Sequence, residues 1–235
     1  MRLFLFDVDG TLVNAGGAGR AALAHALHEV YGTTGAIDRY DFRGRTDPRI
    51  VLDLLGGAGW DEADIRVRLE TCFAAYLREL DTLLADGARV RLLPGVADVV
   101  RALSVREDAV VGLLTGNIEP GARVKLRSTG LWPFFRVGAF GSDDADRRRL
   151  PAIARQRTRD LLGHEIPFDR VTIIGDTPLD VDCARACGAL AVAVATGRFS
   201  TTELAACDPD LLFADFAEVD RVIEELRGRS ESTGR

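Results

Sequence analysis

The sequence predicts an α/β fold, in which a doubly wound, Rossmann-like parallel sheet is interrupted by an inserted all-helical domain. Short apolar runs alternate with stretches of helical period along most of the chain, which is typical of parallel strands joined by helices. Residues 15–88 break this alternation, because they contain helical patterns and no strand pattern. We therefore expect an α/β core at 1–14 and 89–227, a helical domain at 15–88, and a disordered tail at 228–235.

The predicted sheet begins at the N-terminus with Leu3-Phe4-Leu5-Phe6, a continuous apolar run that indicates a strand covered on both faces. The run ends at Asp7 and Asp9, followed by Gly10 and Thr11. Because alternate residues of a strand face the same way, the two carboxylates can project into one cleft. Crowded carboxylates favour a cation between them, and Mg²⁺ prefers oxygen ligands. The sequence thus predicts a magnesium site here, with a simple solvated turn as the alternative.

The inserted segment opens with a glycine-rich stretch, 15–19, which lacks the Gly-Lys-Ser/Thr of a phosphate-binding loop and predicts a flexible connection. Helices are predicted over 20–30, 48–55 and 61–84. The polar loop before the second helix contains Arg45, which could reach a carboxylate or second phosphate of a ligand or form a surface salt bridge.

Strand and helix patterns alternate again after the insertion. The predicted helices are 95–103, 119–129, 150–162, 178–187 and 219–226, and the predicted strands are 109–114, 137–140, 171–174, 190–195 and 211–213. Ligands of doubly wound sheets bind beyond the carboxyl ends of the strands. Polar residues stand at that position after three strands, namely Asp7 with Asp9, Thr115, and Asp176. We therefore expect one site at this edge of the sheet.

Three segments carry a resemblance to a known family. The hydrophobic-Asp-x-Asp-Gly-Thr sequence ending at Thr11 resembles the first motif of the haloacid dehalogenase superfamily, most of whose members are phosphohydrolases. The stretch 113–117, Leu-Leu-Thr-Gly-Asn, resembles the second motif, and 173–180, Ile-Ile-Gly-Asp-Thr-Pro-Leu-Asp, resembles the fourth. They occur in the expected order.

The resemblance implies a role for each matching residue. Asp7 would be the nucleophile, and Asp9 would act as general acid and then as general base. Mg²⁺ would be held by Asp7, the backbone carbonyl of Asp9 and Asp176. The transferring phosphoryl group would be bound by residues of the second motif, Thr115, Gly116 and Asn117.

The third motif departs from the superfamily pattern, which normally places a Lys before the helix that leads to the fourth motif. The region 141–151 contains no Lys, and Lys125 lies too early in the chain. An Arg stays charged and can hold phosphoryl oxygens in a fork, so we expect Arg147 to substitute, with Arg148 as a close competitor. Asp180 is expected to be structural or to support the metal ligands, because Thr177-Pro-Leu-Asp180 has the pattern of a capping box.

The resemblance implies a Mg²⁺-dependent phosphatase that hydrolyses a small phosphomonoester through an aspartyl-phosphate, similar to phosphoglycolate-phosphatase-like members with a type-one helical cap. Two alternatives stay open. A phosphomutase of the β-phosphoglucomutase type would share both acids and a helical cap, and a catalytically silent module would bind a small phosphate without turnover.

The composition of the chain limits the kinds of partner that we expect. A formal net charge of −6 argues against nucleic-acid binding, which needs a basic surface. The four cysteines show no disulfide framework, and no apolar run reaches the length of a signal segment or a membrane span. We therefore expect a cytoplasmic protein whose partner is a small phosphorylated metabolite, with no membrane or nucleic-acid partner. The oligomeric state and the particular substrate stay open.

Overall fold

The computed structural model describes residues 1–228 and contains a six-stranded sheet in the order β5-β4-β1-β6-β7-β8. All neighbouring strands of this sheet are parallel, as expected for strands joined by helical crossovers. The strands are β1 (Arg2–Phe6), β4 (Ala109–Thr115), β5 (Val137–Phe140), β6 (Val171–Gly175), β7 (Leu190–Val194) and β8 (Leu211–Phe213). The predicted doubly wound parallel sheet is confirmed.

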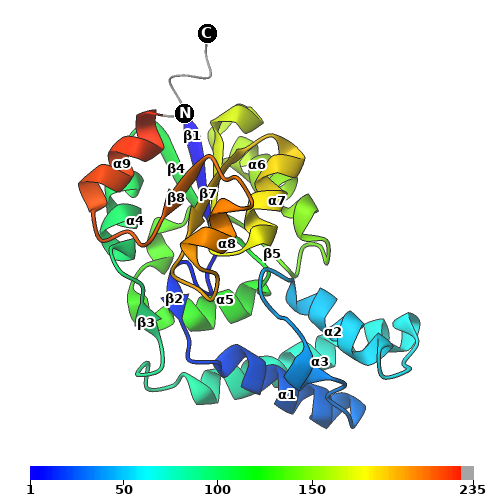
Figure 1. Cartoon of the computed structure of the whole chain (residues 1–235). Coiled ribbons are helices and arrows are strands. Elements are labelled where there is room, and N and C mark those ends of the chain that lie inside the picture. Colours follow the sequence, from blue (N-terminus) through cyan, green and yellow to red (C-terminus); the bar gives the residue numbers. More distant parts are fainter. Residues whose placement is uncertain (229–235) are drawn as a thin grey trace.

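Helices cover both faces of the sheet (Figure 1). In β1, Phe4 and Phe6 belong to one buried cluster, whereas Leu3 and Leu5 belong to another on the opposite face. The first cluster includes residues of α4 (Val96–Ser104), α5 (Glu119–Leu126) and α9 (Val219–Gly228), and the second includes residues of α6 (Leu150–Leu162), α7 (Pro178–Cys187) and α8 (Thr201–Ala205). This double covering explains why residues 3–6 of the N-terminal strand are all apolar.

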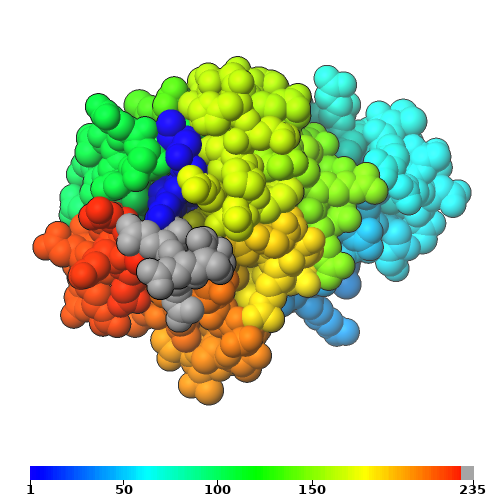
Figure 2. Space-filling view, turned by 90° about the horizontal axis from the view of Figure 1, so that it is seen from above, coloured from blue at the N-terminus to red at the C-terminus, as the bar shows by residue number. Residues whose placement is uncertain are grey.

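A separate helical unit consists of α1 (Ala18–Tyr31), α2 (Asp47–Gly56) and α3 (Glu62–Leu83), which share their own buried apolar cluster. It lies beyond one edge of the sheet in Figure 1 and projects to one side of the core in Figure 2, where its cyan part is seen. The two connections between this unit and the core are paired, because β2 (Val13–Asn14) runs antiparallel to β3 (Arg91–Leu92).

Most predicted elements agree with the structure within a few residues. The main difference concerns the glycine-rich stretch 15–19, which was predicted as a flexible connection. Helix α1 begins inside this stretch, at Ala18. The short elements β2, β3 and α8 were not predicted. Within residues 1–228 there are also five short 3₁₀ helices, at Ile37–Arg39, Arg127–Thr129, Trp132–Phe134, Arg147–Arg149 and Phe168–Arg170.

The C-terminal prediction is tested only in part. Helix α9 extends to Gly228, the first residue of the predicted tail, and 229–235 lie outside the described residues. Within the described chain, no helix combines the length and apolar character needed to cross a bilayer.

Candidate active site

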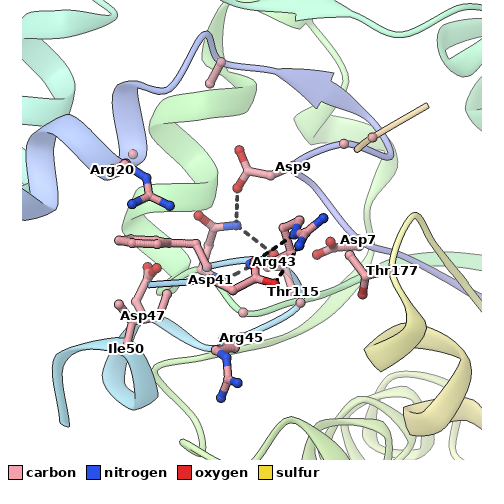
Figure 3. A pocket seen from close by; sticks show the side chains of 18 of the residues that line it. Asp7, Asp9, Arg20, Asp41, Arg43, Arg45, Asp47, Ile50, Thr115 and Thr177 are labelled. Carbon is pink, nitrogen blue, oxygen red and sulfur yellow. Dashed lines mark hydrogen bonds and ion pairs between the residues drawn. The ribbon is translucent and has the colours of Figure 1, made fainter. Parts of the chain in front are cut away.

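The carboxyl ends of β1, β4 and β6 face a pocket of about 600 Å³ between the sheet and the helical unit (Figure 3). Strands contribute the acids and the second-motif residues, and the loop before α2 closes the other side. The predicted site residues that line it are Asp7, Asp9, Arg45, Thr115, Gly116, Asn117, Arg147 and Asp176.

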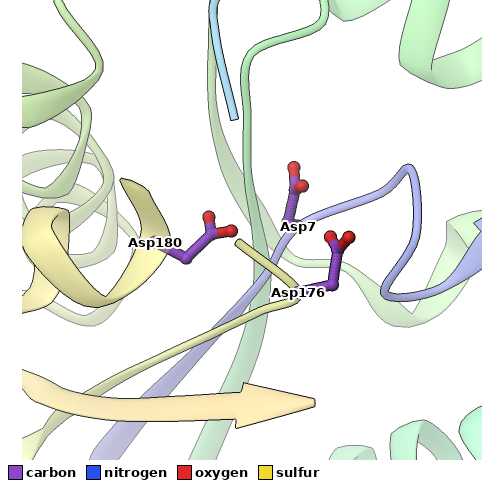
Figure 4. A group of neighbouring side chains, drawn as sticks. All are labelled: Asp7, Asp176 and Asp180. Atoms are coloured by element: carbon purple, nitrogen blue, oxygen red, sulfur yellow. The ribbon is translucent and has the colours of Figure 1, made fainter. Parts of the chain in front are cut away.

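Three buried carboxylates gather at the base of the pocket. Asp7, Asp176 and Asp180 each offer an oxygen within 4.8 Å of the others (Figure 4). Burial raises the pKa of Asp7 to about 6; Arg147 lowers it, while Asp180 and Asp9 raise it. Burial and then the charges of Asp180 and Asp7 raise the pKa of Asp176 well above its ordinary value. These acids repel one another unless a cation or proton lies among them.

The surroundings of Asp176 hold its carboxylate in place. The hydroxyl of Thr11 donates to Oδ1 of Asp176 at 3.3 Å. A Cβ atom added at Gly10 or at Gly197 would overlap the Asp176 carboxylate, and Gly10 also has a φ of +83°. Two glycines therefore permit this position of the carboxylate. A donor set of carboxylate oxygens fits a hard divalent cation such as Mg²⁺.

Asp180 is committed to contacts within the protein. Its Oδ2 accepts hydrogen bonds from the backbone N–H of Thr177 at 3.0 Å and from the Thr177 hydroxyl at 2.7 Å. Its Oδ1 lies 2.5 Å from Nη2 of Arg147. Asp180 thus caps α7 and fixes Arg147, which leaves Asp7 and Asp176 as the freer acids of the cluster.

Arg147 is the arginine of the 147–149 run that reaches Asp7. It is buried, and its Nη2 lies 3.3 Å from Oδ1 of Asp7. Arg148 and Arg149 are exposed, and their guanidinium groups pair with other acids, Asp182 for Arg148 and Asp144 for Arg149. Among the described residues, the Nε of Arg147 is buried without a hydrogen-bond partner.

The second motif is shaped by contacts inside the protein. The Thr115 hydroxyl oxygen accepts hydrogen bonds from the side chain and the backbone N–H of Asn117, at 2.8 Å and 3.3 Å, so its own proton can be donated elsewhere. A Cβ at Gly116 would overlap the carbonyl of Arg45. Gly116 therefore allows the loop before α2 to approach the strand end.

Arg45 itself is partnered within the helical unit. Its Nη1 lies 3.5 Å from Asp53, its guanidinium lies over the ring of Tyr40, and it points away from Asp7 in Figure 3. The neighbouring residues fix this loop to the core. The Thr46 hydroxyl donates to the carbonyl of Ala145 at 2.7 Å, and the backbone N–H of Ile118 donates to Asp47 at 2.9 Å.

Lys125 is a site residue that sequence reasoning missed. It is buried, and its Nζ lies 2.5 Å from Oδ2 of Asp9 and 2.5 Å from Oδ1 of Asn117. Burial lowers the pKa of Lys125, but Asp9, Tyr76 and Asp47 outweigh that effect and the pKa lies above its ordinary value. The sequence does contain one indication of a special role for this residue, because Lys125 is the only lysine among 30 lysine and arginine residues.

Comparisons with known proteins show the family of the chain. The family model for haloacid dehalogenase-like hydrolases matches residues 4–185. A phosphoglycolate phosphatase from Synechococcus elongatus is 28% identical over 229 residues, which cover 96% of this chain and 99% of that protein.

Two solved structures have a similar fold. A hydrolase from Pseudomonas syringae superposes with a TM-score of 0.73 at 20% identity, over 97% of this chain and 100% of that one. A candidate beta-phosphoglucomutase from Bacteroides vulgatus gives a TM-score of 0.71 at 18% identity, over 98% and 90%. At these identities the likeness concerns the fold alone.

Proposed function

Because the chain belongs to the haloacid dehalogenase-like hydrolase family, we propose that it is a Mg²⁺-dependent phosphatase that hydrolyses a small phosphomonoester through an aspartyl-phosphate on Asp7. The observation that carries this proposal is the position of Asp7. It is buried at the end of β1, beside Asp176, with its Oδ1 3.3 Å from Nη2 of Arg147. One carboxylate oxygen is thus oriented by a fixed cation, and the other is left for attack.

In the first step, an oxygen of Asp7 attacks phosphorus, the new O–P bond forms, and the bond from phosphorus to the ester oxygen breaks. Asp9 gives its proton to the departing alkoxide. In the second step, Asp9 takes a proton from water, and the water oxygen attacks phosphorus. The bond from phosphorus to the Asp7 oxygen breaks, which releases phosphate and returns Asp7 to its carboxylate form. Both Asp7 and Asp9 line the pocket, at neighbouring positions of the same strand end.

Donors for the transferring oxygens come from the second and third motifs. The Thr115 hydroxyl keeps its proton for donation, since Asn117 donates to it. The Nε–H of Arg147 is buried and has no hydrogen-bond partner among residues 1–228. Phosphoryl transfer depends mainly on such positioning and charge neutralisation. Mg²⁺, bound by Asp7, Asp176 and the backbone carbonyl of Asp9, would offset the repulsion between the anionic nucleophile and the anionic ester.

We propose that the helical unit is a cap that selects the leaving group, and that it corresponds to the segment 15–88, inserted into a core formed by 1–14 and 89–227. A pocket of about 600 Å³ suits a small metabolite, and the relative from Synechococcus elongatus is named for phosphoglycolate. The four free cysteines agree with a cytoplasmic setting.

Phosphate release tests the proposal. Purified protein is incubated with 4-nitrophenyl phosphate and with a panel of phosphorylated metabolites that includes phosphoglycolate, in MgCl₂ and in EDTA. We expect release in MgCl₂ and its loss in EDTA, and trapping of ³²P on Asp7 after an acid quench. Normal turnover by Asp7→Asn, or no release with any substrate, would overturn the proposal. A requirement for a bisphosphate activator with little net release would instead favour the phosphomutase.

A further inference from the structure

Lys125 is a buried cation that the proposed reaction does not use. It projects from α5, between the core and the helical unit, and its residue exposure is 4%. Lys125 is the single lysine of the sequence, and the other 29 of the 30 Lys and Arg residues are arginines. The space around its ammonium is narrow, since a Cβ at Gly19 of α1 would lie 3.2 Å from Nζ and 3.9 Å from the Tyr76 hydroxyl of α3. A compact ammonium fits such a place better than the wider guanidinium fork.

Lys125, Asn117 and Asp9 form a closed triangle of contacts. The ammonium donates to Oδ2 of Asp9 and to Oδ1 of Asn117, both at 2.5 Å. The Asn117 amide then donates to the same Oδ2 of Asp9 at 2.9 Å. Each end of the amide is therefore fixed, and Asn117 cannot rotate without losing a contact to a charged group.

The two carboxylate oxygens of Asp9 differ in their hydrogen bonding. Both donors meet at Oδ2, whereas Oδ1 has no partner among the described residues. The Asp9 side chain is 45% exposed, although the Lys125 side chain that holds it is 5% exposed. In Figure 3, Asp9 points away from Asp7. An oxygen that accepts two hydrogen bonds is a poor place for a further proton, so a proton on Asp9 belongs on Oδ1.

We propose that Lys125 positions Asp9 for the reaction, by holding Oδ2 so that Oδ1 is the oxygen that exchanges protons with the leaving group and with water. This inference rests on the proposed phosphatase function. The site would then contain two buried cations with separate tasks, Arg147 at the nucleophile and Lys125 at the acid–base residue.

A double-mutant cycle tests whether Lys125 acts through Asp9. Lys125→Met, Asp9→Asn and the double variant are assayed with phenyl phosphate and 4-nitrophenyl phosphate in MgCl₂. Phenolate is the more basic leaving group and needs the acid more. We expect Lys125→Met to lower kcat/KM for phenyl phosphate by about 10- to 100-fold, and to lower that for 4-nitrophenyl phosphate less. In the Asp9→Asn background, the same change should cost less than about twofold, because its partner is already lost.

A matched control removes an exposed cation from the same helix. Arg123 pairs with Glu119, and its side chain is 59% exposed. Arg123→Met should therefore leave kcat/KM unchanged for phenyl phosphate and for 4-nitrophenyl phosphate. The single lysine also allows a readout without substrate. With lysine labelled by ¹³C and ¹⁵N, the side chain gives one signal, which Asp9→Asn should shift in EDTA and Arg123→Met should leave in place.

Three results would overturn the inference: an unchanged kcat/KM in Lys125→Met, an equal loss with both aryl phosphates, or a full loss that persists in the Asp9→Asn background. The last would mean a structural role, which the melting temperatures of the four proteins would show. If Lys125→Met does not fold, Lys125→Gln replaces it in the cycle. Absence of Mg²⁺-dependent release by the unmodified protein would refute the phosphatase proposal itself, whereas the lysine signal would still report the contact with Asp9.

Discussion

Nη2 of Arg147 lies 3.3 Å from Oδ1 of Asp7, and both side chains are almost fully buried. The same nitrogen is 2.5 Å from Oδ1 of Asp180. One guanidinium thus stands between the residue at the end of β1 and the residue that caps α7. A buried cation shared by two acids has two effects on them. It offsets their negative charge, and it fixes the distance between the two carboxylates.

Removal of this cation should affect stability and activity together. Arg147→Met leaves Asp7 and Asp180 buried without their common partner, a change that typically costs about 3–5 kcal/mol. We expect a lower urea midpoint and no measurable turnover of 4-nitrophenyl phosphate. Arg148→Met is the control, because Arg148 is exposed and pairs with Asp182. Its free energy of unfolding should change by less than about 0.5 kcal/mol. Similar effects of the two variants would contradict the separate roles.

The glycine beside Asp176 gives a test of the cation site. A Cβ at Gly197 would overlap Oδ2 of Asp176, so Gly197→Ala should displace that carboxylate. We expect the affinity for Mg²⁺, measured by calorimetry, to fall by roughly 10- to 100-fold, as is usual when a metal ligand is misplaced. Gly56→Ala is the matched control, because a Cβ at Gly56 meets nothing within 4 Å. Unaltered Mg²⁺ binding by Gly197→Ala would place the ion elsewhere.

The sheet and its carboxylate-bearing edge were predictable from local pattern. A continuous apolar run followed by Asp7 requires only that the strand is covered on both faces, and the family match confirms the family resemblance that the motifs indicated. The short strands β2 and β3 were not predictable in this way. Each has two residues, and they pair only because the helical unit leaves and rejoins the core at adjacent points.

Lys125 shows why spacing along the chain was an incomplete guide to the site. Lys125 lies too early in the chain to be the lysine of the third motif, but α5 brings its ammonium to Asp9. Asn117 was expected to bind phosphate from its motif, whereas its side chain contacts Asp9, Thr115 and Lys125. Such contacts depend on the folded positions of several elements, which no single stretch of sequence encodes.

Binding of Mg²⁺ should depend on pH through Asp7. Its folded-state pKa of about 6 exceeds its ordinary value of 3.8 because the group is buried. In EDTA, the stability that Asp7 contributes is therefore fully present below 3.8 and is lost as the pH rises through about 6. A divalent cation favours the carboxylate and restores stability on the alkaline side.

We therefore expect MgCl₂ to raise the melting temperature, relative to EDTA, more at about pH 8 than at about pH 5. The apparent Mg²⁺ affinity should fall by at least about tenfold for each pH unit below about 6, because binding displaces a proton from Asp7 and, where Asp176 is also protonated, a second proton. Equal shifts in melting temperature at both pH values would contradict this linkage.

The seating of the helical unit on the core depends on Gly44, which has a φ of +68°. A Cβ there would lie 2.6 Å from the Thr177 hydroxyl and 2.8 Å from Cβ of Leu179. We expect Gly44→Ala to hold this loop off the core and to lower kcat/KM for 4-nitrophenyl phosphate by about tenfold, because the pocket no longer closes. Gly59 supplies the control, since its φ is +89° but a Cβ there meets nothing within 4 Å. Gly59→Ala carries a similar backbone strain, of about 1 kcal/mol, without the contact, so its melting temperature should fall while kcat/KM is retained. Equal kcat/KM for the two variants would mean that strain alone, and not contact with the core, accounts for the effect at Gly44.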